Sequence, residues 1–424
     1  MPLLLRAIVS AHIAPGFVVR HVWEMRYVAT VLLASCIAQA PAQGFVPERL
    51  ARVDALLQGE VAAGHHAGLS YVLWQGGREA AAGVFGQADR ERQRPLRRDS
   101  IVRIYSMTKP ITAIAALVTI EQQSLRLDAP VEAWLPELQK LQVLLGGTAD
   151  TPQLEPMRTP ITLRMLLSHT AGFSYDFYPN APVAELYRRA DLWNATSNEA
   201  FLQKLAGLPL VAQPGAAWHY SVADDVLGVW LERVHGKSLG AVLTELVTGP
   251  LGMRDTGFDV PEAERPRIAT MYQWENGALR PLAPTFGVFA EPGRGFEAGG
   301  AGLFSTVDDY LRFCRMLLGR GELDGVRIVG RKTFELASLD VLRDGQRTTR
   351  PGDGWGLFSA VRTDQGASPE FGSEGMLHWS GAASTHFFVD PVENLCAVLV
   401  TQHQPFDQHR LIPRFHTAVY QALR

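Results

Sequence analysis

Apolar and polar positions follow β-strand patterns near both ends of the chain. Residues 69–74 and 80–85 form two such runs, and the Gly-Gly turn between them predicts a hairpin. Further strand-like runs follow near the carboxyl end, at residues 355–361, 376–379, 385–389 and 395–401. Because the runs cluster at both termini, we expect one antiparallel sheet built from the two ends of the chain.

The middle of the chain has helical spacing instead. Thr196 and Glu199 have the spacing of a capping box ahead of an apolar stripe. Ser221 can cap a second helix that ends before Gly236, and Ser305 or Thr306 can cap a third. We therefore predict an α+β fold in which an antiparallel sheet with flanking helices comes from residues 44–119 and 301–424. A helical lobe is inserted over residues 120–300, with the functional site in the groove between the two.

Composition and charge limit the classes of substrate and partner that fit this protein. The chain has 424 residues, of which 47% are hydrophobic and 20% charged, with a formal net charge of -3. These values are typical of a globular protein and provide no basic surface for nucleic acid. A small, largely uncharged substrate fits this composition better than a polyanion.

The amino-terminal residues 1–43 read as a targeting segment. From Met25, which is a candidate true start, one basic residue precedes a short apolar run and the sequence Ala38-Gln39-Ala40. The run is shorter than the roughly 20 residues of a spanning helix, so we expect export to the periplasm or medium and no membrane span. The sequence around Cys36 also resembles a lipoprotein box, which leaves a lipid-anchored form open. We expect Cys314 and Cys396 to be buried hydrophobic residues, and a disulfide between them is not decided by sequence.

A Ser-x-x-Lys spacing is the first candidate for chemistry. Ser106 follows a strand-like run and Lys109 lies three residues later, where a helix-forming run begins. Residues three apart share a helix face, so the hydroxyl and the amine can meet. A serine hydroxyl needs a base to become a good nucleophile, and a lysine amine can act as one only where its ammonium form is disfavoured. We therefore expect Lys109 to be partly buried.

Two more segments carry candidate residues. Tyr220 lies on a turn just before a helix, where its phenol can relay a proton. Small residues around Gly381 interrupt a strand and allow substrate to approach its edge. There the backbone N–H of Ala382, together with that of Ser106, can form an oxyanion hole. We expect structural roles for the neighbouring polar residues, which are His169, His219, Asp224 and Asp225.

In order and spacing these segments resemble the serine β-lactamase and penicillin-binding-protein superfamily, nearest its class C branch and the related esterases. The resemblance runs from about residue 47 to the carboxyl end. It implies that Ser106 is the nucleophile, Lys109 its partner and Tyr220 the catalytic tyrosine. The strand motif would be Trp379-Ser380-Gly381.

Two departures from the family pattern change the expected substrate. Val222 stands where the lactamases have an asparagine, and Trp379 stands where a lysine would bind the substrate carboxylate. Both weaken recognition of an anionic β-lactam, so we expect a carboxylesterase for small or short-chain esters that needs no metal or organic cofactor. The alternatives are a β-lactamase or D-alanyl-D-alanine carboxypeptidase, and an acyl-sensor or non-catalytic binding protein that uses the same groove.

Overall fold

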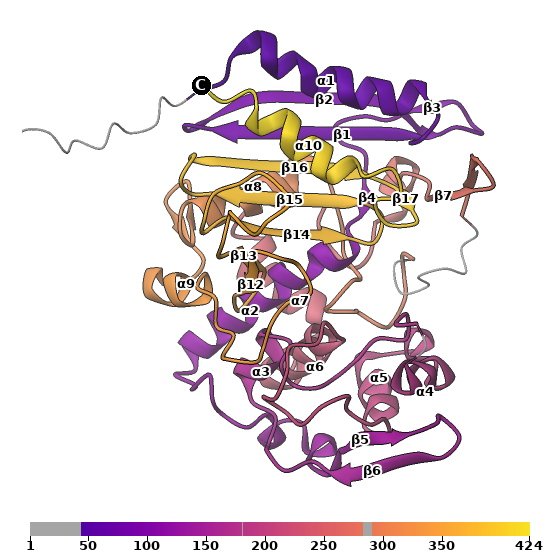
Figure 1. Ribbon diagram of the computed structural model, residues 1–424, viewed down its shortest axis with the longest axis vertical. Helices are drawn as coiled ribbons and strands as arrows, with labels where there is room; N and C mark the ends of the chain where they lie inside the picture. The colour runs from indigo at the N-terminus through magenta and orange to yellow at the C-terminus, as the bar shows by residue number, and fades with distance from the viewer. Residues whose placement is uncertain (1–43, 180, 283–290) are drawn as a thin grey trace, which may run out of the picture. The chain divides into compact units, whose positions relative to one another are not determined.

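An eight-stranded antiparallel sheet dominates the protein, described by a computed structural model for residues 44–179, 181–282 and 291–424. Both ends of the chain contribute strands, as predicted (Figure 1). In spatial order they are β12 (Asp353–Trp355), β13 (Ala360–Arg362), β14 (Leu377–Gly381), β15 (Thr385–Asp390), β16 (Leu395–Thr401), β1 (Gly68–Gln75), β2 (Arg78–Asp89) and β3 (Arg94–Pro95). The targeting segment 1–43, with Met25 and Cys36, lies outside the described residues.

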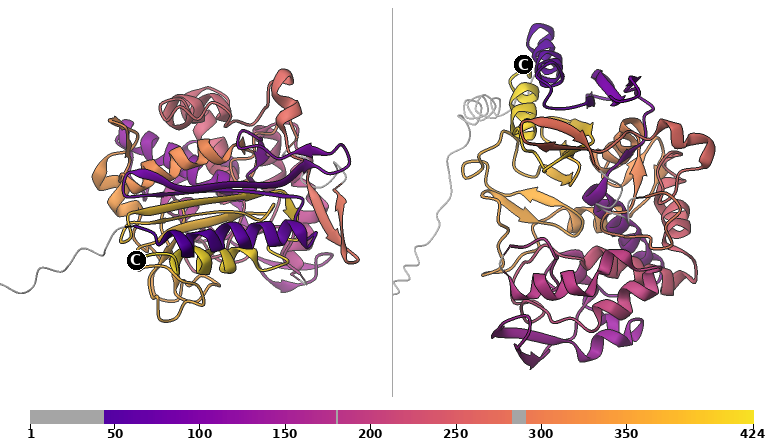
Figure 2. Two further views of the ribbon diagram at one scale, coloured as in Figure 1. Left: turned by 90° about the horizontal axis from the view of Figure 1, so that it is seen from above. Right: turned by 90° about the vertical axis from the view of Figure 1, so that its right-hand side faces the viewer.

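Helices cover both faces of this sheet. The terminal helices α1 (Pro47–Ala62) and α10 (Leu411–Tyr420) pack on one face, as Figure 2 shows from above. Helix α8 (Val307–Leu318) packs on the other face, against β1, β15 and β16. The sheet is therefore buried on both sides, and β15 and β16 are buried at every position.

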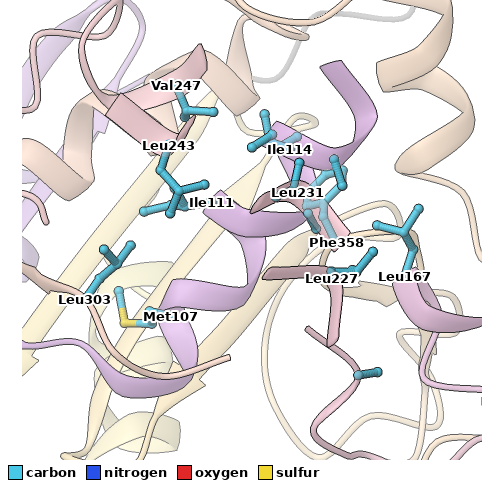
Figure 3. Close-up of a cluster of buried hydrophobic side chains, with 14 of the residues drawn as sticks. Met107, Ile111, Ile114, Leu167, Leu227, Leu231, Leu243, Val247, Leu303 and Phe358 are labelled. Atoms are coloured by element: carbon cyan, nitrogen blue, oxygen red, sulfur yellow. The ribbon is translucent and has the colours of Figure 1, made fainter. Parts of the chain in front are cut away.

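Helix α2 (Thr108–Gln122) is the central element of the larger core. Every residue from Thr108 to Ile120 is buried, because the helix packs against α6 (Ala223–His235), α7 (Leu239–Leu243) and the following turn at Thr244–Thr248. Figure 3 shows Ile111 and Ile114 of this helix among the side chains of Leu227, Leu231 and Leu243. A fixed helix of this kind provides a rigid base for the residues at its first turn.

The segment between residues 120 and 300 also contains strands that the sequence pattern did not indicate. Its helices include α3 (Leu163–Leu167), α4 (Pro182–Ala190) and α5 (Asn198–Leu205), and its two hairpins are β5–β6 (Gln142–Gly147 and Pro152–Pro156) and β7–β8 (Tyr272–Glu275 and Ala278–Pro281). Strand β17 (His403–Gln404) pairs with β7 and joins the carboxyl-terminal region to this segment. The division into two lobes stays our interpretation. The remaining short elements are β4 (Val102–Arg103) paired with β9 (Phe304–Ser305), β10 (Glu322–Leu323) paired with β11 (Val326–Arg327), and α9 (Arg331–Ala337).

Three local predictions were wrong in detail. Ser197, not Thr196, caps α5 by accepting a hydrogen bond from the Ala200 N–H. Ser221 does not cap α6, because that helix begins at Ala223 with Val222 as its N-cap. The run at residues 355–361 is a hairpin and not one strand: the chain turns after β12, and the Gly356 N–H bonds the Ser359 carbonyl.

Other local predictions were confirmed. Thr306 caps α8, and Gly236 ends α6 in a left-handed conformation. Cys314 and Cys396 are both buried and free, without a disulfide between them. Within the described ranges, no helix is long and apolar enough to cross a membrane.

Candidate active site

Ser106 and Lys109 lie at the amino end of α2. Ser106 is in a single 3-10 turn, η1 (Tyr105–Met107), and Lys109 is in the first turn of the helix itself. Tyr105, directly before the serine, has a φ of 43°, a left-handed conformation that a residue with a side chain seldom adopts. This sharp turn carries the chain from β4 into the helix. Ser106 thereby lies in the wall of a cavity while Lys109 stays beneath it.

The Lys109 amine is buried among polar and aromatic partners. Its side chain is 1% exposed, and Nζ lies 3.3 Å from Ser106 Oγ and 2.7 Å from the carbonyl oxygen of Gly300. The ring centroids of Tyr220 and Tyr175 are 4.7 Å and 5.4 Å from Nζ. The prediction of a partly buried lysine in contact with the serine is therefore confirmed, with deeper burial than expected.

Tyr220 meets this pair from the turn before α6. Its hydroxyl accepts a hydrogen bond of 3.3 Å from Trp379 Nε1, and its carbonyl accepts one of 2.8 Å from the Tyr178 hydroxyl. The aromatic rings of Tyr220 and Trp379 lie 5.1 Å apart. The structure thus brings the three sequence segments together at one point, although 159 residues separate the tyrosine from the tryptophan.

Strand β14 approaches Ser106 with its free edge. Its neighbour β13 pairs only with Leu377 and His378, so the following residues of β14 lie beside η1 instead. A Cβ placed on Gly381 would lie 2.2 Å from the carbonyl oxygen of Ile104, a contact that no side chain tolerates. Glycine at this position therefore allows the strand to lie against the segment that carries Ser106.

A cavity of about 720 Å³ opens at the meeting point. Its lining includes all of the predicted strand-motif residues, Trp379, Ser380, Gly381 and Ala382, as well as Ser106 and Tyr220. Other lining residues were not foreseen from the sequence: Phe177, Tyr178, Trp218, Gln273, Thr349, Arg350, Gln404, Pro405 and Phe406. Phe177 and Phe406 are 60% and 48% exposed. The wall is thus largely apolar and includes six aromatic side chains, two of which are open to solvent.

Arg350 is the cation among the cavity-lining residues. Its guanidinium bonds both carboxylate oxygens of Glu370, at 3.1 Å and 3.0 Å, and lies 3.2 Å from Asp353. The family resemblance implies that Trp379 replaces a lysine on the strand, and Arg350 supplies a positive charge to the cavity lining from another segment. Because two carboxylates already hold this charge, it is much less available to an anionic substrate than a free lysine.

Ionisable groups are concentrated below Tyr220, at the start of α6. Burial raises the pKa of Asp225 to about 7, against the lowering effects of nearby Lys109 and the Gly300 N–H, which bonds its Oδ1 at 2.9 Å. His169 Nε2 lies 3.2 Å from Asp224 Oδ2, and burial lowers the pKa of this histidine. We call Lys109, His169, Asp224 and Asp225 the helical wall; each is at most 3% exposed.

The polar residues for which we expected structural roles lie close to the site. His169 follows α3 in a left-handed turn, and its ring is 4.9 Å from that of Tyr220. Ser221 contacts the Nδ1 of this histidine at 3.3 Å, and His219 Nε2 contacts Ser174 Oγ at 3.2 Å. None of these side chains lines the cavity, so they support Tyr220 from behind. Within the residues that the structure describes, no group of acidic, histidine or cysteine side chains has the arrangement of a metal site.

Comparison with known proteins places these features in context. A family model described as Beta-lactamase matches residues 53–420. The chain is 38% identical to the uncharacterized protein Rv1367c of Mycobacterium tuberculosis, over 81% of this chain and 87% of that protein. It is 35% identical to esterase EstB of Burkholderia gladioli, over 74% and 81%. Among solved structures, EstCE1, a hydrolase with promiscuous acyltransferase activity, superimposes with a TM-score of 0.76 at 30% identity, covering 88% of this chain and 99% of its own.

Proposed function

The chain belongs to the beta-lactamase family, and on that premise we propose that it is a carboxylesterase working through an acyl-enzyme on Ser106. The observation that carries this proposal is the contact between Ser106 Oγ and the buried Lys109 amine, with Tyr220 and Trp379 beside them. The esterase EstB among the relatives and the hydrolase EstCE1 among the solved structures support the same chemistry. The expected substrates are small, largely uncharged esters.

The residues divide the proton transfers between them. Ser106 Oγ attacks the ester carbonyl and passes its proton to the Lys109–Tyr220 pair, and the same pair returns a proton to the departing alcohol. The backbone N–H groups of Ser106 and Ala382 hold the oxyanion of the tetrahedral intermediate. Water then attacks the acyl-enzyme by the reverse sequence and releases the acid.

Three features favour an ester over a β-lactam. Val222 is fully buried and offers no side-chain amide to a substrate. Trp379 contributes an indole N–H that is already bonded to Tyr220, and Arg350 is held by two carboxylates. The aromatic cavity wall suits an apolar acyl or alcohol group better than a carboxylate.

The decisive experiment combines active-site labelling with turnover. A fluorophosphonate probe followed by peptide mapping should label Ser106, and Ser106→Ala should lose both the label and hydrolysis of short-chain aryl esters. Sustained turnover distinguishes an esterase from an acyl-sensor, which would give a single burst. Faster hydrolysis of a chromogenic cephalosporin than of the esters would favour the β-lactamase alternative, and a label on another serine would refute the site.

Acyl transfer to an alcohol is a second candidate activity. The EstCE1 structure is of a hydrolase with promiscuous acyltransferase activity, and the aromatic cavity wall here suits an apolar alcohol that competes with water. Adding a medium-chain alcohol to the ester assay should then yield a transesterified product, detected by mass spectrometry. If only the free acid appears, at saturating alcohol, transfer is excluded.

A further inference from the structure

A chain of hydrogen bonds runs from the cavity through the sheet to the opposite face. Ser380 Oγ lies 2.8 Å from Nδ1 of His386, and Nε2 of His386 lies 2.8 Å from Nε2 of His416. Nδ1 of His416 lies 3.1 Å from the carbonyl oxygen of Phe371. Ser380 lines the cavity, whereas the two histidines, on β15 and α10, are fully buried.

Both histidines are neutral at physiological pH. Burial lowers the pKa of His386 well below its usual value, and it lowers that of His416 to about 4 even though the Glu370 carboxylate acts in the opposite direction. Each ring therefore carries one proton, and each contact in the chain needs one donor and one acceptor.

The carbonyl at the far end fixes the direction of every bond. A carbonyl oxygen only accepts, so His416 carries its proton on Nδ1 and its Nε2 is bare. His386 must then donate from Nε2, which leaves its Nδ1 bare. Ser380 must therefore donate its hydroxyl proton to His386.

The opposite tautomer of His386 is disfavoured by the same contacts. The Trp379 backbone also hydrogen-bonds this ring, and the alternative tautomer of His386 carries its proton on Nδ1. That placement would leave two bare nitrogens facing each other across 2.8 Å inside the protein. An unpaired contact of this kind between buried acceptors is costly, so the chain directed inward from Ser380 is the arrangement that satisfies all three bonds.

We propose that His386 and His416 are positioning residues that turn the Ser380 hydroxyl into a fixed hydrogen-bond acceptor toward the cavity. With its proton committed inward, this oxygen presents lone pairs to the substrate. It selects esters that carry a hydrogen-bond donor, such as a hydroxyl or amide N–H, near the scissile group. The Ser380 oxygen disfavours esters that carry a carboxylate at this position, and it forms no hydrogen bond with an ether oxygen. This substrate selection rests on the proposed esterase function. The assignment of the protons to the histidine rings does not depend on it.

The proton positions can be tested on the unmodified enzyme. Nitrogen-15 NMR of protein labelled at histidine reports the tautomer of each ring, and spectra of His386→Phe and His416→Phe assign the two signals. We expect a proton on Nε2 of His386 and on Nδ1 of His416. A proton on Nδ1 of His386, or a doubly protonated ring in either residue, overturns the proposal whatever the enzyme hydrolyses.

The selectivity is tested with 4-nitrophenyl esters whose acyl chains have equal length and carry a hydroxyl, a methyl ether or a carboxylate. We expect kcat/KM for the hydroxyl ester to exceed that for the ether about five- to tenfold, and that for the carboxylate by more. Ser380→Ala should remove the preference for hydroxyl over ether. An unchanged preference in this variant overturns the proposal even if esterase activity is intact.

His416→Phe separates positioning from simple packing. The new ring keeps the contact with Phe388, but the His386 Nε2–H loses its acceptor. The His386 proton should move to Nδ1, which frees the Ser380 hydroxyl to donate into the cavity. We then expect the hydroxyl and ether esters to react within about twofold of each other, with an altered His386 signal. His235→Asn, at the end of α6 and away from the cavity, is the control and should keep the wild-type ratio. A wild-type ratio in His416→Phe overturns the proposal.

Discussion

Two groups of polar side chains, most of them buried behind the cavity lining, differ in kind. The helical wall buries a lysine, two carboxylates and a histidine around the start of α2 and α6. The strand wall, which we define as Trp379, Ser380, His386 and His416, contains neutral donors and acceptors in directed hydrogen bonds. On the proposed function, the two groups have separate tasks. Proton transfer takes place among the buried ionisable groups, and the directed hydrogen bonds orient the substrate.

The free-energy cost of burying the polar side chains also differs between the helical wall and the strand wall. Burying a charge is expensive unless partners offset it, and Asp225 responds by holding its proton up to about pH 7. A neutral hydrogen-bond chain has a smaller desolvation cost, and it loses only the bonds that a substitution breaks. Substitutions in the helical wall should therefore affect catalysis or stability strongly, and those in the strand wall should mainly change preference among substrates.

Replacing the buried Lys109 amine should have the largest effect of any substitution in the two walls. Lys109→Met keeps an apolar chain of similar length but removes the proton acceptor beside Ser106. We expect kcat/KM for a short-chain aryl ester to fall about 10³-fold, the range of a lost general base. A fall of less than tenfold in steady-state kinetics would contradict the role of the amine.

Tyr220→Phe tests the residue that contacts both walls, through Lys109 on one side and Trp379 on the other. The ring over the Lys109 amine stays, while the hydroxyl that accepts the Trp379 N–H is lost. A lost proton relay should lower kcat about 10²-fold and leave KM within a fewfold of wild type. If KM rises and kcat does not change, the tyrosine binds substrate and does not transfer protons.

Asp225 should make stability depend on pH. Its pKa is about 7 in the folded protein against 3.8 for the unperturbed group, so the folded state binds more protons between these values. The free energy of unfolding should therefore fall as pH rises from about 4 to 7, then level off. A shift of this size corresponds to about 4 kcal/mol.

Asp225→Asn keeps an oxygen for the Gly300 N–H but cannot ionise. Its new amide group needs a partner, at a cost of about 1 to 3 kcal/mol. We therefore expect it to gain about 1 to 3 kcal/mol over wild type at pH 8 in denaturant titrations, and to lose the slope between pH 4 and 7. The same slope in both proteins would show that another group titrates.

The smallest effect is expected on the strand wall. Trp379→Phe removes only the neutral N–H that bonds Tyr220 and keeps an aromatic ring in the cavity. One neutral hydrogen bond corresponds to about three- to tenfold in rate, and we expect that loss in kcat/KM. A loss as large as that of Lys109→Met would erase the distinction between the two walls.

Local sequence patterns correctly predicted those helices and strands that are specified by a few neighbouring residues. The first hairpin became β1 and β2, and Thr306 caps α8, because alternation and capping act over short distances. The capping predictions at Thr196 and Ser221 failed, because Ser197 caps α5 instead and α6 begins after Val222 without a side-chain cap. Gly356 was read as part of a strand because an apolar run hides a tight turn.

The parts of the site that lie close together in the sequence could be predicted from local spacing, and the parts that come from distant segments could not. Ser106 and Lys109 share one helical turn, so their spacing alone predicted their contact. Tyr220 and Trp379 needed the family resemblance, since no rule of local structure joins residues so far apart. The His386–His416 contact depends on how α10 docks on β15, and Arg350 reaches the cavity from a loop. Neither leaves a recognisable pattern in the sequence.

The close approach of β14 to Ile104 limits how this enzyme can be re-engineered. Position 381 has no room for any side chain, so a larger residue there would displace the segment that carries Ser106. Mutant libraries that aim at new substrates are therefore best directed to the outer lining, at Phe177, Thr349 and Phe406. Substitutions at these three positions should change which substrates enter the cavity and leave the positions of Ser106, Lys109 and Tyr220 unchanged.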